Sequence, residues 1–181
     1  MLVQLQNGSV KNQITKEFYY THDLSKTAAA EYRSFIKPDG DSSLGANSSY
    51  TNWEGSDGKL PEGQEMEILK IGFTAKGKDG AVLTVADFAK LGTGRFKVQI
   101  GEREILAGHM GSLFPSPITT NVVITDIEAV KHSVPSPVVE IPLALPEVWR
   151  AGEMIKFTFR VEQAMTGDVQ VMARILGKNI Q

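Results

Sequence analysis

Residues 138–176 read VVEIPLALPEVWRAGEMIKFTFRVEQAMTGDVQVMARIL. Apolar and polar side chains alternate strictly from Ile155 to Val161, and they alternate again from Val169 to Ile175. A period of two is typical of a β-strand with one buried and one wet face. The connection between the two runs is short, so the pattern predicts two strands paired as a hairpin. We expect the inward row, which begins at Ile155, to hold a larger core.

Further strands are predicted along the chain from short apolar runs separated by turn residues. Pro142 marks the last of them as an edge strand or a bulge. Residues 85–91 are expected to form a helical turn, capped by Thr84 and ended by Gly92. The other predicted strands are 66–75, 81–85, 95–100, 104–106, 121–130 and 138–145, and residues 2–5 and 18–20 are shorter apolar pieces that read as strands or as an ordered arm.

Residues 24–36, LSKTAAAEYRSFI, are the best candidate for a short N-terminal helix, because alanine favours helix and Pro38 forces a stop. Together the elements predict a mainly all-β fold, an antiparallel sandwich or barrel of about eight strands. We expect one domain. Its segment 1–64 holds an N-terminal arm, the short helix and a long loop, and its segment 65–181 holds the sandwich core.

Composition excludes several classes of protein. The chain has 181 residues, of which 41% are hydrophobic, so it can bury a real core. Its net charge of −2 gives no basic footprint for nucleic acid. The absence of cysteine excludes disulfides, thiolate zinc sites and cysteine nucleophiles. No stretch approaches the roughly 18 apolar residues of a membrane span, and the polar start does not read as a signal peptide. We therefore expect synthesis in the cytoplasm.

No motif predicts catalysis. His22, His109 and His132 lack the spacing of metal ligands. Ser112 lies near His109, but the sequence has no GxSxG motif around it. Gly92-Thr93-Gly94 fits neither phosphate-loop nor dinucleotide patterns and reads as a turn. We therefore expect no catalytic residue, no metal ion and no cofactor, and we expect that the protein is not an enzyme.

Three aromatic side chains are the candidates for contact with a ligand or a partner. Tyr50 and Trp53 lie in the loop 38–63, which is rich in Gly, Ser, Asn, Asp and Pro, and Trp149 follows Pro146. Long loops of this kind are often functional. Exposed aromatic rings on a β-sandwich can stack on a sugar, but Trp149 is equally suited to cap the core.

The order of motifs in the second half of the chain carries a family resemblance. GRFKVQIGEREIL at residues 94–106 is followed by the Pro-bounded strand VVEIPLALPE at 138–147, the turn WRAGE at 149–153 and the alternating strand MIKFTFRVEQ at 154–163. Over residues 65–181 this resembles the single jelly-roll capsid (coat) proteins of tailless icosahedral phages and related viruses.

The resemblance implies a jelly-roll-like β-sandwich that works through contacts. The chain would be a viral structural protein, a capsid subunit that self-assembles through symmetric contacts with copies of itself and with other virion proteins. It would be made in the host cytoplasm and located in the virion, and contact with an internal membrane stays open. The alternative is a carbohydrate- or ligand-binding β-sandwich, such as a receptor-binding or cell-surface module. A cupin-type enzyme comes third, since it needs clustered inward histidines and a carboxylate.

Overall fold

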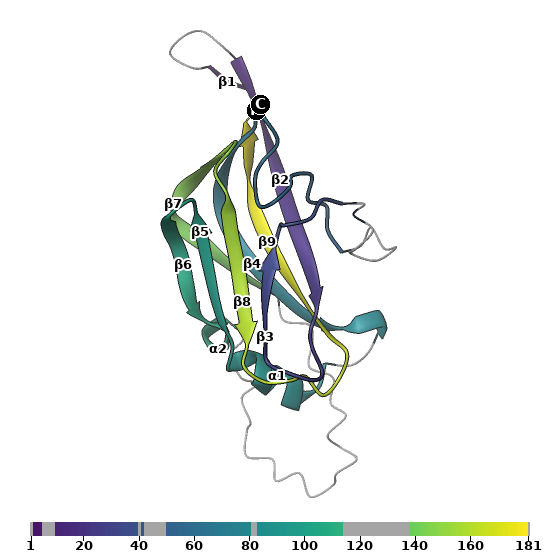
Figure 1. The fold of residues 1–181 in the computed structure, drawn as a ribbon. Helices are drawn as coiled ribbons and strands as arrows, with labels where there is room; N and C mark the ends of the chain where they lie inside the picture. Colours follow the sequence, from purple (N-terminus) through teal and green to yellow (C-terminus); the bar gives the residue numbers. More distant parts are fainter. Residues whose placement is uncertain are drawn as a thin grey trace, which may run out of the picture.

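The computed structural model describes residues 2–4, 10–39, 41, 50–80, 83–113 and 138–180. β-Strands dominate it, as Figure 1 shows, so the predicted all-β sandwich is confirmed. The strands are β1 (Leu2–Gln4), β2 (Val10–Asp23), β3 (Ala30–Ser34), β4 (Glu65–Gly77), β5 (Arg95–Ile100), β6 (Arg103–His109), β7 (Val138–Arg150), β8 (Ile155–Val161) and β9 (Val169–Ile180), and the short helices are η2 (Lys78–Gly80), α1 (Val85–Gly92) and α2 (Met110–Leu113).

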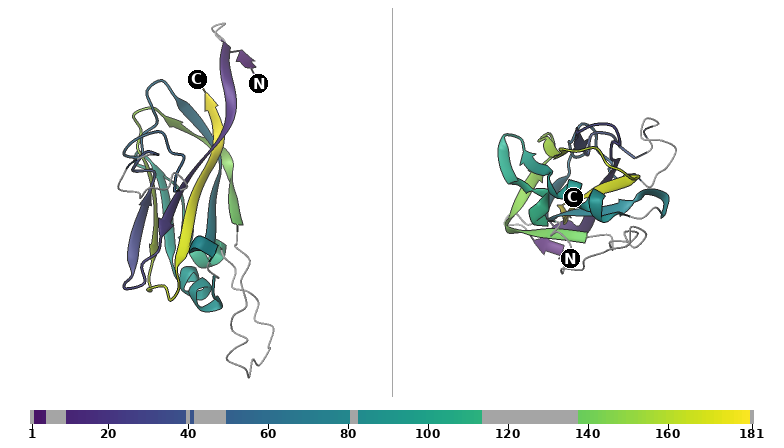
Figure 2. Two further views of the ribbon diagram at one scale, coloured as in Figure 1. Left: turned by 90° about the vertical axis from the view of Figure 1, so that its right-hand side faces the viewer. Right: turned by 90° about the horizontal axis from the view of Figure 1, so that it is seen from below.

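The strands form two antiparallel sheets that lie face to face (Figure 2). One sheet has the order β1-β2-β9-β4-β7, and the other has the order β3-β8-β5-β6. The primary pairs are β2 with β9, β3 with β8, β4 with β7 and β5 with β6. The chain is therefore one long hairpin, closed at Gly101 with φ 58°, that has been rolled into two layers. Rolling adds the pairs β4 with β9 and β5 with β8, which completes a jelly roll.

The C-terminal hairpin predicted from the alternating pattern is wrong. β8 lies in the four-stranded sheet and β9 lies in the five-stranded sheet, so residues 162–168 cross between layers. Both strands turn an apolar row toward the same core, but they do so from opposite sides. The inward row itself is confirmed, because Ile155, Phe157 and Phe159 are at most 1% exposed.

The predicted N-terminal helix is also wrong. Residues 24–29 form no regular element, and Ala30–Ser34 is strand β3, paired with β8. The ring of Tyr32 stacks on Phe159 with 5.0 Å between centroids. This packing and the ladder to β8 outweigh the helix preference of the alanines, which amounts to only a few tenths of a kcal/mol per residue, about 0.5 or less. Segment 1–64 thus supplies strands to both sheets.

Three smaller predictions fall on described residues. Residues 83 and 84, from the strand expected at 81–85, have no strand structure, and they lead into α1. The capping by Thr84 is confirmed, since its Oγ1 accepts a hydrogen bond of 3.1 Å from the Asp87 amide. Pro142 lies on an edge strand, β7, at a shift in the β4–β7 register, as predicted. The strand expected at 121–130 lies outside the described residues.

Helix α1 is fastened to the β8–β9 connection by a buried carboxylate. The side chain of Asp87 accepts hydrogen bonds from the amides of Thr166 at 2.6 Å and Gly167 at 3.0 Å, and from the Thr84 hydroxyl at 2.9 Å. Burial alone would raise the pKa of Asp87, but these hydrogen bonds outweigh it and lower the pKa. The end of the sandwich that carries α1 and α2 is therefore tied across both sheets (Figure 1).

Candidate functional site

The two tryptophans proposed as ligand contacts lie in the core. Trp53 and Trp149 stack on each other with 5.2 Å between centroids and 12° between planes, and both are 0% exposed. The indole nitrogen of Trp149 donates to the carbonyl of Glu153 at 2.9 Å. Neither ring offers a face to a sugar in this structure. Trp149 instead caps the core, which was the alternative expected for this residue from the sequence.

Tyr50 is half-buried and takes part in a polar cluster around Asp23. Its hydroxyl donates to the Asp23 carboxylate at 2.8 Å, and Gln170 and Lys78 donate to the same carboxylate at 2.7 and 2.5 Å. Burial would raise the pKa of Asp23, but the hydrogen bonds from Lys78, Gln170 and Tyr50 lower it overall. The cluster joins β2, β9, the loop at residue 50 and the turn after β4, so its role is to hold these segments together.

The histidine and serine candidates are not brought together. His22 is packed between the sheets with Nε2 3.0 Å from the Ser34 hydroxyl, whereas His109 is exposed on β6. The Ser112 hydroxyl donates to the backbone carbonyl of His109 at 2.6 Å, not to its ring. Within the ranges that the structure describes, no group of three His, Cys, Asp or Glu side chains is arranged to hold a metal ion. His132 lies outside those ranges.

The outer edge of β2 is covered by the loop that follows residue 50. The Asn52 side chain accepts from the Tyr19 amide at 2.8 Å and donates to the Glu17 carbonyl at 2.7 Å. The Thr51 hydroxyl donates to the Tyr19 carbonyl at 2.7 Å, and the Thr21 amide donates to the Tyr50 carbonyl at the same distance. These bonds occupy backbone groups that an edge strand otherwise offers to another chain.

The opposite side of the sandwich is a different kind of surface. β6 and β7 are the last strands of their sheets, and no described strand pairs with their outer edges. Arg103 links them at one end through an ion pair of 3.0 Å to Glu147. Ile105 on β6 and Leu143 on β7 are half-buried and pack against the core, and Leu145 on β7 is 76% exposed. We call these two strand edges and their apolar side chains the β6–β7 seam.

The seam has the composition of a contact surface. An exposed strand edge can pair with another chain, and exposed apolar side chains favour burial against a partner. Only part of this signal is visible in the sequence, where Pro142 predicts an edge strand or a bulge at 138–145. In the part of the chain that is described, neither α1 nor α2 has the length and apolar character needed to cross a membrane. No protein-family model matches the chain, and a search of curated proteins finds no similar sequence.

Proposed function

We propose that this chain is a viral structural protein, a phage capsid subunit that assembles through symmetric contacts with copies of itself and with other virion proteins. The jelly-roll strand order is the observation that carries the proposal. Jelly rolls serve as shell subunits, lectins and cupins. The choice among these functions therefore depends on the side chains in the interior of the sandwich and on those at its surface.

The interior favours a scaffold over a cupin-type enzyme. Apart from Asn179 near the end of β9, the buried side chains in the inward rows of β4, β5, β8 and β9 are apolar, and they include the ring contacts of Phe73 with Phe96 and Phe157 at 5.2 Å. A cupin site would need histidines and a carboxylate at such positions. His22 is the one inward histidine among the described residues, and aromatic rings surround it.

The surface favours assembly over sugar binding through aromatic rings. Both tryptophans are buried, while the β6–β7 seam leaves two strand edges and Leu145 open to a partner. The start of β2 and the short strand β1 project beyond the end of the sandwich, as Figures 1 and 2 show, because β2 begins at Val10 and its pairing with β9 begins at Gln13. Such an extension can reach a neighbouring subunit.

Electron microscopy and light scattering of the purified protein test the proposal. We expect concentration-dependent rings or shells, and a strictly monomeric protein at high concentration would contradict the shell role. The variant Leu145→Glu should assemble less while keeping its circular dichroism spectrum, because a charge would have to be buried in the contact. Ala86→Glu, at an exposed position of α1, adds the same charge away from the seam and should assemble normally. If both variants lose assembly to the same extent, the contact between subunits does not lie at the seam.

A further inference from the structure

The outer face of the four-stranded sheet is cationic, although the whole chain carries a charge of −2. Most of its positive side chains have partners. Lys97 pairs with Glu104 at 3.0 Å and Arg160 with Glu162 at 3.2 Å. The outward residues of its strands include the cations Arg33, Arg95, Lys97, Lys156 and Arg160 and the carboxylates Glu31 and Glu104.

Arg95 differs from the other cations on this face. Its side chain makes no ion pair or hydrogen bond with any residue that the structure describes. In the strand register it lies opposite Arg160 on β8 and opposite His109 on β6. Side chains directly opposite on one face have Cβ atoms about 5 Å apart, and like charges in such a pair are destabilising. Two arginine side chains thus start from neighbouring positions on one face, and of the two only Arg160 has an ion-pair partner among the described residues.

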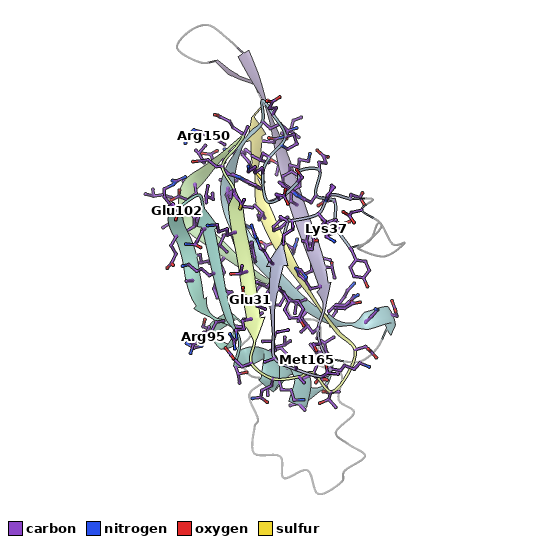
Figure 3. The ribbon with its side chains drawn as sticks, viewed as in Figure 1. Glu31, Lys37, Arg95, Glu102, Arg150 and Met165 are labelled. Carbon is purple, nitrogen blue, oxygen red and sulfur yellow. The ribbon has the colours of Figure 1, made fainter. Side chains whose placement is uncertain are left out.

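A hollow lies over this pair. It has a volume of about 400 Å³, within the range of small-molecule sites. The hollow exists because the next row of the sheet has small side chains, Ala107 and Thr158, on either side of Lys97. Glu31 of β3 lies at the far end of the Arg160–Arg95–His109 row and lines the same hollow. Figure 3 labels Arg95 and Glu31 at the surface of the sheet.

We propose that this hollow binds a small molecule carrying a compact oxyanion, a phosphate or a carboxylate group, held between Arg95 and Arg160. The planar guanidinium fork matches both groups through paired hydrogen bonds. An anion at this place removes the repulsion between the two arginines. His109 and Thr158 supply further polar atoms beside it, and the Glu31 carboxylate can accept a hydrogen bond from a hydroxyl group of the same ligand. The proposal does not depend on the shell role.

The test uses the full-length protein at low concentration, titrated by NMR with inorganic phosphate and separately with glucuronate, at an ionic strength held constant with sodium chloride. We expect saturable binding of at least one probe. Arg95→Gln should weaken it roughly ten- to hundredfold, the usual effect of losing a charge-assisted hydrogen bond. Arg33→Gln, on the same sheet face but bonded to the Met154 sulfur at 3.0 Å, is the matched control and should bind as the wild type does.

Thermal unfolding gives a second readout. Without a ligand, Arg95→Gln should melt at the same temperature as the wild type or higher, because it removes the repulsion with Arg160. The bound probe should raise the melting temperature of the wild type and not that of the variant. The proposal is overturned if neither probe binds saturably, or if Arg95→Gln and Arg33→Gln lose affinity equally. It is also overturned if Arg95→Gln changes only self-association, which would assign the hollow to a carboxylate of a second copy.

Discussion

Replacing His22 by phenylalanine together with Ser34 by alanine should make the fold less sensitive to mild acid. The His22 ring packs against Tyr20 at 5.0 Å and against Tyr32 and Phe159 at 5.4 Å. Burial lowers its pKa from 6.5 to about 4, and the neighbouring Asp23 offsets only part of this shift. The native state therefore holds His22 as a neutral ring.

The sign and size of the effect follow from the two pKa values. Between about pH 4 and pH 6.5 the unfolded chain protonates His22 and the native state does not, so stability falls as the pH falls. The contribution of the neutral His22 ring to the free energy of unfolding is complete above pH 6.5 and is lost by about pH 4. The difference of about 2.5 pKa units corresponds to about 3 kcal/mol, at 1.36 kcal/mol per unit. About 2 kcal/mol of this loss is expected between pH 7 and pH 4.5.

Urea unfolding at pH 7 and pH 4.5 measures the loss in each protein. The second substitution is needed because Ser34 is 0% exposed, and its hydroxyl would otherwise lose its partner inside the protein. Phenylalanine suits the aromatic surroundings of the ring. Asp23 and Asp87 contribute little to the loss of stability between pH 7 and pH 4.5. Their pKa values in the native protein are lowered from 3.8, so both carboxylates stay ionised over this range.

The control is His109→Gln, which changes an exposed histidine on β6 and should leave the acid-induced loss of stability as it is in the wild type. If the double variant loses as much stability as the wild type between the two pH values, protonation of His22 is not the cause of the acid sensitivity. An NMR titration showing that His22 in the native protein protonates near pH 6.5 would lead to the same conclusion.

Three further predictions test the fold, the first two with a control substitution. Phe157→Asp should cost more than about 4 kcal/mol in thermal or urea unfolding, because it places a charge in the core, whereas Thr158→Asp on the outer face of β8 should cost under about 1 kcal/mol. Asp87→Ala should cost about 3 kcal/mol and speed amide exchange in residues 162–168, while Asp168→Ala removes only an exposed ion pair worth at most about 1 kcal/mol. Asn52→Ala should cost about 1–2 kcal/mol and increase aggregation seen by light scattering, because it uncovers the edge of β2.

The strands of the second half were predictable from the sequence because burial on one face of a sheet has a period of two. β8 and β5 show this most clearly, since every second residue in each is buried. The strand partners were not predictable in this way. The partners of β8 are β3 and β5, and alternation reports which face is buried without reporting which strand lies alongside. The short connection to β9 therefore suggested a hairpin that does not form.

The helix expected at 24–36 failed for a related reason. Helix preference is local, whereas the pairing of β3 with β8 and the stacking of Tyr32 on Phe159 join residues far apart in the chain. The same limit applies to the tryptophans. A loop rich in Gly, Ser and Asn is expected on the surface, and nothing in its composition shows that it folds back to bury Trp53 against Trp149 or to place Asn52 on the edge of β2.

The unequal protection of the two sides limits how copies of this chain can meet. If β2 and the β6–β7 seam were both open, one side of each copy could pair with the other side of the next, and such head-to-tail contacts grow into filaments when they do not close. The Asn52 and Thr51 side chains occupy backbone groups of β2 at Glu17 and Tyr19, so another strand cannot pair with β2 at that part of its edge. Pro142 and Pro146 also remove backbone donors from β7, which disfavours a continuous sheet across the seam. Contact at the seam would then rest on apolar side chains such as Leu145, an arrangement that suits packing of separate sandwiches better than fusion of their sheets.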